Sequence, residues 1–203
     1  MIPEAPTLTG RTVQLEPLRL DLVDDLVVAA NEDRSTYSWT AVPADADSMQ
    51  RYVQGLLTEQ AEGGVVPFAQ RRLADGAVVG CTRFMRLEWW GGRAVPDEVE
   101  VGGTWLAASA QRTGLNSEAK YLLFRHAFES WTVHRVCLCT DARNLRSRDA
   151  IERIGAQFEG ILRNHRGSYA HGEAGHSARD SAIFSITSAE WPALRTRLEG
   201  MLQ

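Results

Sequence analysis

Alternating polar and apolar residues along the chain predict a series of short β-strands. The pattern is most regular at residues 98–106, where glutamates alternate with valines before a run of small residues. Pro17 ends the first strand, and Ala74-Asp75-Gly76 forms a hairpin turn between two others. Strands are predicted at residues 11–16, 65–73, 77–87, 98–106, 133–140, 156–165 and 181–186.

A second pattern, in which apolar residues recur every three or four positions, predicts helices. Asp45 or Asp47 caps the second helix, and Gly155 ends the fourth, whose Leu145, Ile151 and Ile154 are expected to face inward. A Thr-x-x-Glu capping box at residues 187–190 opens the last helix. The helices are predicted at residues 20–30, 48–60, 115–130, 144–154 and after residue 190.

The order of these elements predicts an α/β (α+β) fold in a single domain over residues 1–203. Its sheet is expected to be mixed and mostly antiparallel, with about seven strands and helices on its flanks. Strands 98–106 and 133–140 are joined by a crossover helix, which favours a parallel pairing between them.

The composition narrows the classes of function. With 203 residues, 44% of them hydrophobic and 24% charged, the chain resembles an ordinary soluble protein. A net charge of -4 argues against nucleic acid as a partner, and no apolar run is long enough to span a membrane. The N-terminus lacks a basic and an apolar signal region, which predicts a cytoplasmic location. The three cysteines show no metal-ligand spacing, so no metal site is expected.

Residues 98–120 hold the strongest functional signal in the sequence. A predicted strand is followed by a Gln-Arg-Thr-Gly turn and then by a run of good helix formers. Such a turn presents unpaired backbone N–H groups at the positive end of a helix dipole. This arrangement is a common site for phosphate, and it predicts a phosphorylated ligand.

Two short motifs at this point resemble the GNAT superfamily of acyl-CoA-dependent N-acyltransferases. The superfamily motif Gln/Arg-x-x-Gly-x-Gly/Ala is met by Gln111 and Gly114, and it is not met at Asn116. A second signature is Asn-x-x-Ser followed by a helix and a turn with a glycine and an aromatic residue. It is met by Asn144, Ser147, Gly155 and Phe158. Together with the run Phe158-Glu-Gly-Ile-Leu-Arg163, they look most like the branch that acetylates the N termini of ribosomal proteins.

Asn116 stands where the family has a small residue that lets a phosphate approach the backbone. Asparagine keeps its backbone N–H, and its side-chain amide can itself donate to a phosphate oxygen. The departure therefore bears on the affinity for pyrophosphate and not on the fold, and it leaves a weakened or altered acyl-CoA site open.

The resemblance implies acyl-CoA as a co-substrate, bound where two parallel strands splay apart at a bulge. The backbone of Trp105, Leu106 and Ala107 is expected to bond the pantetheine arm, together with Asn144, which can equally be a helix N-cap. The pyrophosphate is expected at the turn and the first residues of the helix. These cofactor-binding candidates are Gln111, Arg112, Thr113, Gly114, Leu115 and Asn116.

The catalytic candidates are Glu100 and Ser147. Glu100 would take a proton from the acceptor amine, with Glu98 as the alternative; a strand without a bulge puts both on one face with Thr104 and Leu106. Ser147 is the matching position for a donor to the departing thiolate, although a helix-capping hydroxyl explains it as well. A solvated strand carboxylate is the plain alternative for either glutamate.

Aromatic and basic residues supply further candidates. Tyr37 and Trp39 fall where the family shapes its acceptor pocket, while Trp89 and Trp90 would line that pocket or a dimer contact. One or two arginines are expected to meet the 3′-phosphate of CoA. They belong to a group of six, namely Arg143, Arg146, Arg148, Arg153, Arg163 and Arg166.

The resemblance thus predicts an N-acyltransferase that moves an acetyl or succinyl group to a primary amine of a protein N-terminus or a small molecule. Direct attack in a ternary complex is expected, since no cysteine is predicted at the splay to carry the acyl group. The alternative is an inactive GNAT-fold module that senses acyl-CoA or binds a protein, and a homodimer is compatible with either. A nucleotide-binding function lacks the motifs that it needs.

Overall fold

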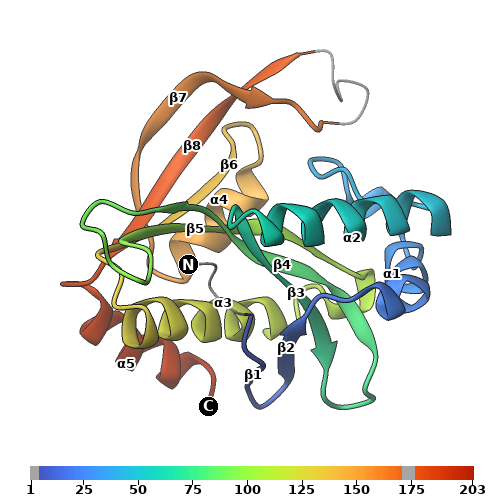
Figure 1. The fold of residues 1–203 in the computed structure, drawn as a ribbon, viewed down its shortest axis with the longest axis horizontal. Coiled ribbons are helices and arrows are strands. Elements are labelled where there is room, and N and C mark those ends of the chain that lie inside the picture. Colours follow the sequence, from blue (N-terminus) through green and yellow to red (C-terminus); the bar gives the residue numbers. More distant parts are fainter. Residues whose placement is uncertain (1–4, 171–176) are drawn as a thin grey trace.

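The computed structural model describes residues 5–170 and 177–203, in which eight strands form one sheet. The strand order is β1-β2-β3-β4-β5-β6-β8-β7, so the sheet is antiparallel except between β5 and β6 (Figure 1). The strands are β1 (Leu8–Thr9), β2 (Val13–Pro17), β3 (Val65–Arg72), β4 (Val78–Glu88), β5 (Glu98–Leu106), β6 (Arg135–Asp141), β7 (Gln157–Gly167) and β8 (Ala178–Thr187).

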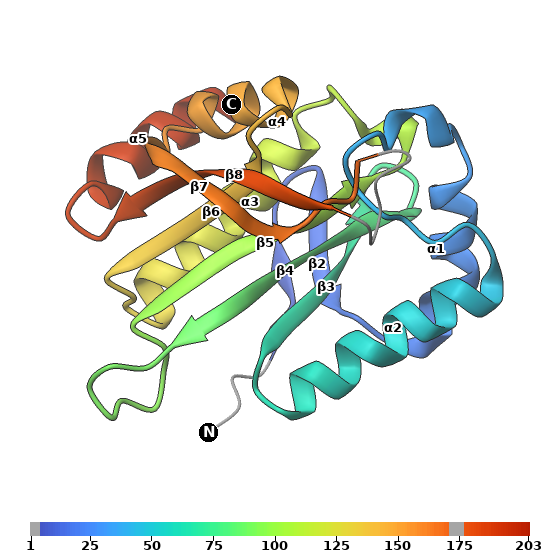
Figure 2. The same ribbon diagram turned by 90° about the horizontal axis from the view of Figure 1, so that it is seen from above.

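Helices flank both faces of this sheet, as Figures 1 and 2 show. Side chains of β4 point alternately to the two faces: Phe84 contacts the rings of His126 and Trp131 just after α3, whereas Arg83 reaches Tyr52 of α2. The first face carries α3 and α5, and the second carries α1 and α2. The helices are α1 (Val23–Ala30), α2 (Ala46–Ala61), α3 (Leu115–Arg125), α4 (Leu145–Arg153) and α5 (Trp191–Met201).

The parallel pair β5 and β6 splays apart, as predicted. Their pairing runs only from Glu98 opposite Arg135 to Glu100 opposite Cys137, although both strands continue. On its other side, β5 carries a bulge, because two of its residues between Gly102 and Trp105 oppose a single residue of β4. Gly103 has a φ of +57° there, a conformation that favours glycine.

This bulge changes which side chains of β5 share a face. An unbulged strand would have placed Thr104 on the same face as Glu100. In the structure Thr104 bonds Lys120 of α3, while Glu100 points to the opposite face and contacts Arg166 of β7. The extra residue in the bulge reverses the alternation of side chains beyond it, so Glu100 and Trp105 share a face instead.

Most predicted elements are confirmed, with small differences at their ends. Strand β1 was not predicted, since two residues are too few to show a pattern. Leu145 is 64% exposed, so the expectation that it faces inward was wrong, whereas Ile151 and Ile154 are buried. The Glu190 carboxylate accepts bonds from Thr187, but α5 begins only at Trp191, so this contact closes the preceding turn. Among the described residues, no helix is long and apolar enough to cross a membrane.

Candidate active site

The turn before α3 presents free backbone donors, as the sequence predicts. The N–H groups of Arg112, Thr113 and Gly114 donate to no acceptor within residues 5–170 and 177–203. Arg112 and Gly114 both have positive φ, at +62° and +86°. Left-handed residues of this kind are typical of the backbone turns that bind anions. The dipole of α3 adds positive potential at the same place. The turn therefore has the geometry of an anion site.

Asn116 lies in the first turn of α3 and fits this anion site. Its Oδ1 atom is buried and has no hydrogen-bond partner among the described residues. A rotation of the amide by 180° puts its NH₂ group in that position, where it would donate to a phosphate oxygen. Leu115 is buried in the core and anchors the helix, and its N–H lies 3.4 Å from the Thr113 hydroxyl oxygen.

Gln111 joins the turn to its surroundings through its side chain. The amide nitrogen donates to the Leu106 carbonyl at 2.9 Å and to the Thr36 hydroxyl at 3.1 Å. The amide oxygen accepts from Arg146, in the first turn of α4, at 2.5 Å. The residues before α3 and at the start of α4 are therefore held side by side, which follows from the parallel pairing of β5 and β6.

The backbone beyond the bulge is partly engaged within the protein. The Ala107 N–H donates to the Val79 carbonyl at 2.8 Å. The Trp105 carbonyl lies 3.4 Å from the side-chain nitrogen of Gln70, and the Leu106 carbonyl already accepts from Gln111. Ligand bonds to these three residues would have to use the remaining groups or replace existing contacts.

Asn144 and Ser147 lie together at the start of α4. The Asn144 side chain accepts a bond from the Ser147 N–H at 3.1 Å, so the helix-cap interpretation is correct. The side-chain NH₂ of Asn144 and the Oγ of Ser147 have no hydrogen-bond partner in the described part of the chain. Both donors are therefore available to a ligand beside the start of α4, which follows β6.

Glu100 is 4% exposed and lies in the last residue pair before the splay. Both terminal nitrogens of Arg166 donate hydrogen bonds to the Glu100 carboxylate, one of them to Oε1 at 2.9 Å. The Nε atom of Arg86 lies 3.8 Å from the other carboxylate oxygen. Glu98 instead pairs with Arg135 at 3.5 Å, nearer the start of the strand. A proton reaches Glu100 only where Arg166 moves aside or a water molecule relays it.

The expectation that no cysteine lies at the splay was wrong. Cys137 of β6 is paired with Glu100 at that point. Burial raises the pKa of its thiol to about 12, and the nearby Glu100 acts in the same direction. The thiol therefore stays protonated at neutral pH and is a poor nucleophile, which favours direct attack by the amine over an acyl-cysteine intermediate.

Residues 31–45, between α1 and α2, span the mouth of the splay. The Tyr37 hydroxyl donates to the Leu106 carbonyl at 3.1 Å, and burial raises the pKa of Tyr37 to about 12. The Arg143 guanidinium lies over the Trp39 ring at 5.1 Å, beside the start of α4. Tyr37 thus contacts the end of β5, and Trp39 the loop after β6. Trp90 stacks on His134 at the far end of β5, away from this segment.

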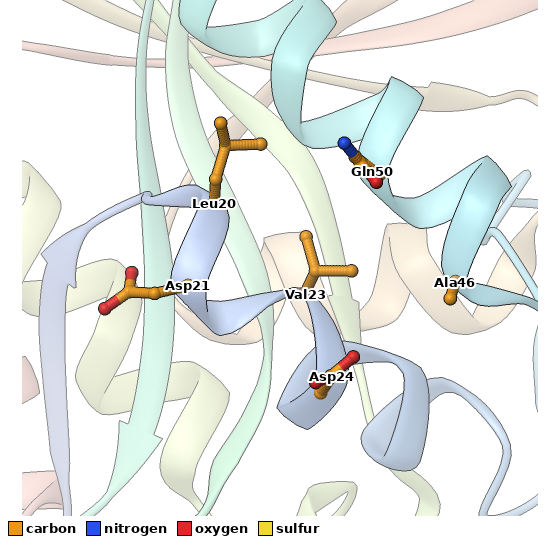
Figure 3. Close-up of a pocket in the computed structure, with 6 residues that line it drawn as sticks. All are labelled: Leu20, Asp21, Val23, Asp24, Ala46 and Gln50. Atoms are coloured by element: carbon orange, nitrogen blue, oxygen red, sulfur yellow. The ribbon is translucent and has the colours of Figure 1, made fainter.

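A pocket on the surface does not coincide with these residues. The pocket has a volume of about 290 Å³. It lies between the start of α1 and the start of α2, and Figure 3 shows the residues that line it. None of the predicted site residues lines it; the lining residues are Leu20, Asp21, Val23, Asp24, Ala46 and Gln50. The chemistry of the splay gives stronger grounds for the site than the shape of this pocket.

Sequence reasoning missed two charged residues near the splay, Arg83 and Lys120, and expected a different contact for a third, Arg166. Arg166 was considered for the CoA phosphate, but a bulge in β7 at residues 163–165 directs it to Glu100 instead. Arg83 lies against the bulge of β5, and the buried Lys120 bonds Thr104 beneath it. None of these contacts has a local sequence signal, because each depends on the relative position of distant strands.

Comparisons with known proteins agree with this geometry. The curated protein named "Putative ribosomal N-acetyltransferase YdaF", from Bacillus subtilis (strain 168), is 30% identical over 119 residues, which are 59% of this chain and 58% of that protein. A GCN5-related N-acetyltransferase from Brucella melitensis has 27% identity and a TM-score of 0.85 over 100% of this chain and 88% of its own. Mycobacterium smegmatis RimJ, solved with CoA-disulfide, shares the fold at 23% identity and a TM-score of 0.79 over 97% of this chain and 95% of its own.

The family model of the acetyltransferase (GNAT) domain matches residues 12–157. These residues include the bulged strand β5, the turn before α3, the splay and the start of α4. The match covers more than half of the sequence, and the chain therefore belongs to the GNAT acetyltransferase family.

Proposed function

We propose that residues 1–203 form one acyltransferase domain that moves an acetyl group from acetyl-CoA to a primary amine. The observation that carries this proposal is the run of free N–H groups at Arg112, Thr113 and Gly114, next to the gap between β5 and β6. The turn would hold the pyrophosphate, and the pantetheine arm would extend from it into the gap. RimJ, which shares the fold, was solved with CoA-disulfide, in line with this proposal.

Different residues around the gap would assist different parts of the transfer reaction. The amine nitrogen attacks the thioester carbon, so a C–N bond forms and the C–S bond breaks. The hydroxyl of Ser147 would donate a hydrogen bond to the departing thiolate. The side-chain NH₂ group of Asn144 would donate a hydrogen bond to the pantetheine arm. Glu100 would accept the proton that the amine loses, directly or through water, after the acceptor displaces Arg166. An α-amine, with a pKa near ~8, needs only such a proton acceptor.

We propose a protein N-terminus as the acceptor, lying beside residues 31–45 at the mouth of the gap between β5 and β6. The name of the B. subtilis relative points to ribosomal acceptors, and Tyr37 and Trp39 offer aromatic surface at the mouth of the gap. The protonated thiol of Cys137 supports direct attack in a ternary complex.

An acetyl-transfer assay tests this proposal. The protein is incubated with acetyl-CoA or succinyl-CoA and a set of N-terminal peptides, and free CoA thiol and acylated peptide are measured together. Equal formation of both products, with acetyl-CoA as the preferred donor, is expected. Binding of acyl-CoA without transfer to any peptide or small amine would instead favour the alternative, a module that only senses acyl-CoA.

A further inference from the structure

Building on the acyltransferase function proposed above, we propose that the acceptor amine belongs to a molecule that also carries an anionic group, a carboxylate or a phosphate, bound by Arg83 beside the splay. The proposal rests on an excess of positive charge around Glu100, in which Arg83 and Arg166 are partly buried and Arg86 is exposed. Three guanidinium groups, of Arg83, Arg86 and Arg166, approach this part of the sheet from two strands.

Arg83 is the guanidinium group closest to the bulge. A Cβ atom at Gly103 would lie 2.6 Å from the Arg83 Cζ atom, so only glycine lets the guanidinium rest against the bulged backbone. The Nε atom of Arg83 is buried and has no hydrogen-bond partner among the described residues. No carboxylate of those residues lies within the 4.0 Å limit for an ion pair with Arg83. Its charge is therefore uncompensated beside the bulge of β5.

Arg86 and Arg166 share a single carboxylate, that of Glu100. With Arg83 included, three positive charges face one negative charge. Water solvates the exposed Arg86, so the charge that lacks a partner beside the bulge is that of Arg83. The Nε atom of Arg166 is also buried without a partner in the described part of the chain. The pKa of the neighbouring His165 is lowered by burial and by Arg166 and Arg86, so the imidazole is not a further source of charge at neutral pH.

Such an arrangement is unfavourable in the free protein and favours an anionic ligand. Half-buried guanidinium groups gain strong, bidentate hydrogen bonds from a carboxylate or phosphate. The CoA pyrophosphate is not this anion, because its expected turn at Arg112–Gly114 lies beyond the other end of the gap, past Leu106. An anion at Arg83 would instead place an amine of the same molecule near Glu100, which attracts the ammonium form.

The test uses acceptors that differ only in charge. The carboxylate pair is two tetrapeptides, identical except for Asp or Asn at the second position, and the phosphate pair is O-phosphoethanolamine and ethanolamine. Binding of each probe to the full chain is measured by thermal shift, with and without saturating CoA. Acetyl transfer to each probe is measured separately. The test variants are Arg83→Gln and Arg83→Lys. The control is Arg197→Gln on α5, which has the same charge change as Arg83→Gln; the wild-type Arg197 side chain donates to the Arg153 carbonyl.

At least one anionic probe is expected to bind tenfold or more tightly than its neutral partner, and the pair that responds identifies carboxylate or phosphate. Arg83→Gln should abolish that difference, Arg83→Lys should restore part of it, and Arg197→Gln should leave it unchanged. Equal binding within both pairs, binding of no anionic probe, or a preference that survives Arg83→Gln would overturn the anion site. Failure of CoA binding or of all transfer would count against the acyltransferase function instead.

Discussion

The Nζ atom of Lys120 lies 2.6 Å from the hydroxyl oxygen of Thr104, directly under the bulge of β5. A second hydroxyl, of Thr82, is 3.4 Å away, and no carboxylate of the described residues is within ion-pair distance. Lys120 is 6% exposed, so this amine joins α3 to the strand segment that opens the gap. The bulge is thus supported from the face opposite to Glu100.

This burial predicts an unusual dependence of stability on pH. Burial lowers the pKa of Lys120 to about 7, and Glu100 opposes the shift. Between about pH 7 and 10.5 the unfolded chain binds a proton that the folded chain lacks, so the free energy of unfolding should rise with pH. The contribution is up to about 1.4 kcal/mol per pH unit. Chemical denaturation of wild type and Lys120→Met at several pH values measures it.

The comparison with Lys120→Met isolates this contribution from the buried cysteines, whose raised pKa values act in the opposite direction. The difference in unfolding free energy between the two proteins should change steadily from pH 7 to 10. A difference that stays constant over that range would show that the buried amine does not titrate there.

Replacing Glu100 by Gln should reduce the turnover number by about a hundredfold or more, since a positioned proton acceptor contributes roughly 10²–10⁴ to the rate. The affinity for acetyl-CoA should be unchanged, because the carboxylate contacts Arg166 and not the phosphate turn. The matched control is Glu98→Gln, two positions away on the same strand and paired with Arg135. Equal losses in both variants would argue against a special role for Glu100.

Ser147→Ala should slow acetyl transfer while leaving stability nearly unaffected, since its hydroxyl has no partner in the described part of the chain. Asn144→Ala should lower the free energy of unfolding by about 1 kcal/mol, because its side chain caps α4. Urea denaturation together with initial rates separates these effects. Full activity in Ser147→Ala would show that the thiolate does not need the Ser147 hydroxyl as a hydrogen-bond donor.

Glu118 should contribute strongly to stability although it lies outside the active site. Its carboxylate accepts backbone N–H bonds from Arg11, Thr12 and Val13, which join α3 to the start of β2. Glu118→Ala leaves these donors unpaired and should cost about 2 kcal/mol. Glu152→Ala, an exposed position on α4, is the control that should change little.

The pH dependence of Glu118 follows from the same bonds. Burial alone would raise its pKa, but the bonds from Thr12 and the backbone outweigh this effect and lower it. The stabilisation is therefore present above the ordinary carboxyl pKa of about 4.3 and is lost as pH falls below it. Wild type should lose more stability than Glu118→Ala between pH 5 and 3, as denaturation at both values would show.

The sequence predicts the elements of this fold well, because each has a local signal. The alternation at residues 98–106 matches β5, and the glycine at position 114 marks the start of α3. The parallel pairing follows from the order of elements, and the splay was expected from the family resemblance. The bulge was expected only from the family resemblance. Its position at Gly103, which determines the faces of Thr104 and Trp105, depends on the register with β4.

The site could be predicted only in its local parts. The turn at Arg112–Gly114 and the cap at Asn144 are determined by nearby residues. The contacts of Glu100, by contrast, depend on Arg166, which is 66 residues away and is redirected by the irregular pairing of β7 with β8. The pairing of Cys137 with Glu100 also depends on the strand register, which the sequence does not specify alone.

A thermal-shift titration with acetyl-CoA on wild type, Gly114→Ala and Gly114→Trp tests the proposed acyl-CoA site most directly. Gly114 has a φ of +86°, and a Cβ atom at this position would have no neighbour within 4 Å. Alanine therefore adds backbone strain alone, whereas tryptophan also fills the anion site. At a hundredfold excess over the dissociation constant, binding adds about 2.7 kcal/mol, which raises the melting temperature of wild type by roughly 5–10 °C.

We expect this shift in wild type and its loss in Gly114→Trp, with the circular dichroism spectrum of the variant unchanged. Gly114→Ala should keep part of the shift, because its small side chain leaves the anion site open. No shift in wild type at millimolar acetyl-CoA, or an undiminished shift in Gly114→Trp, would contradict an acyl-CoA site at this turn.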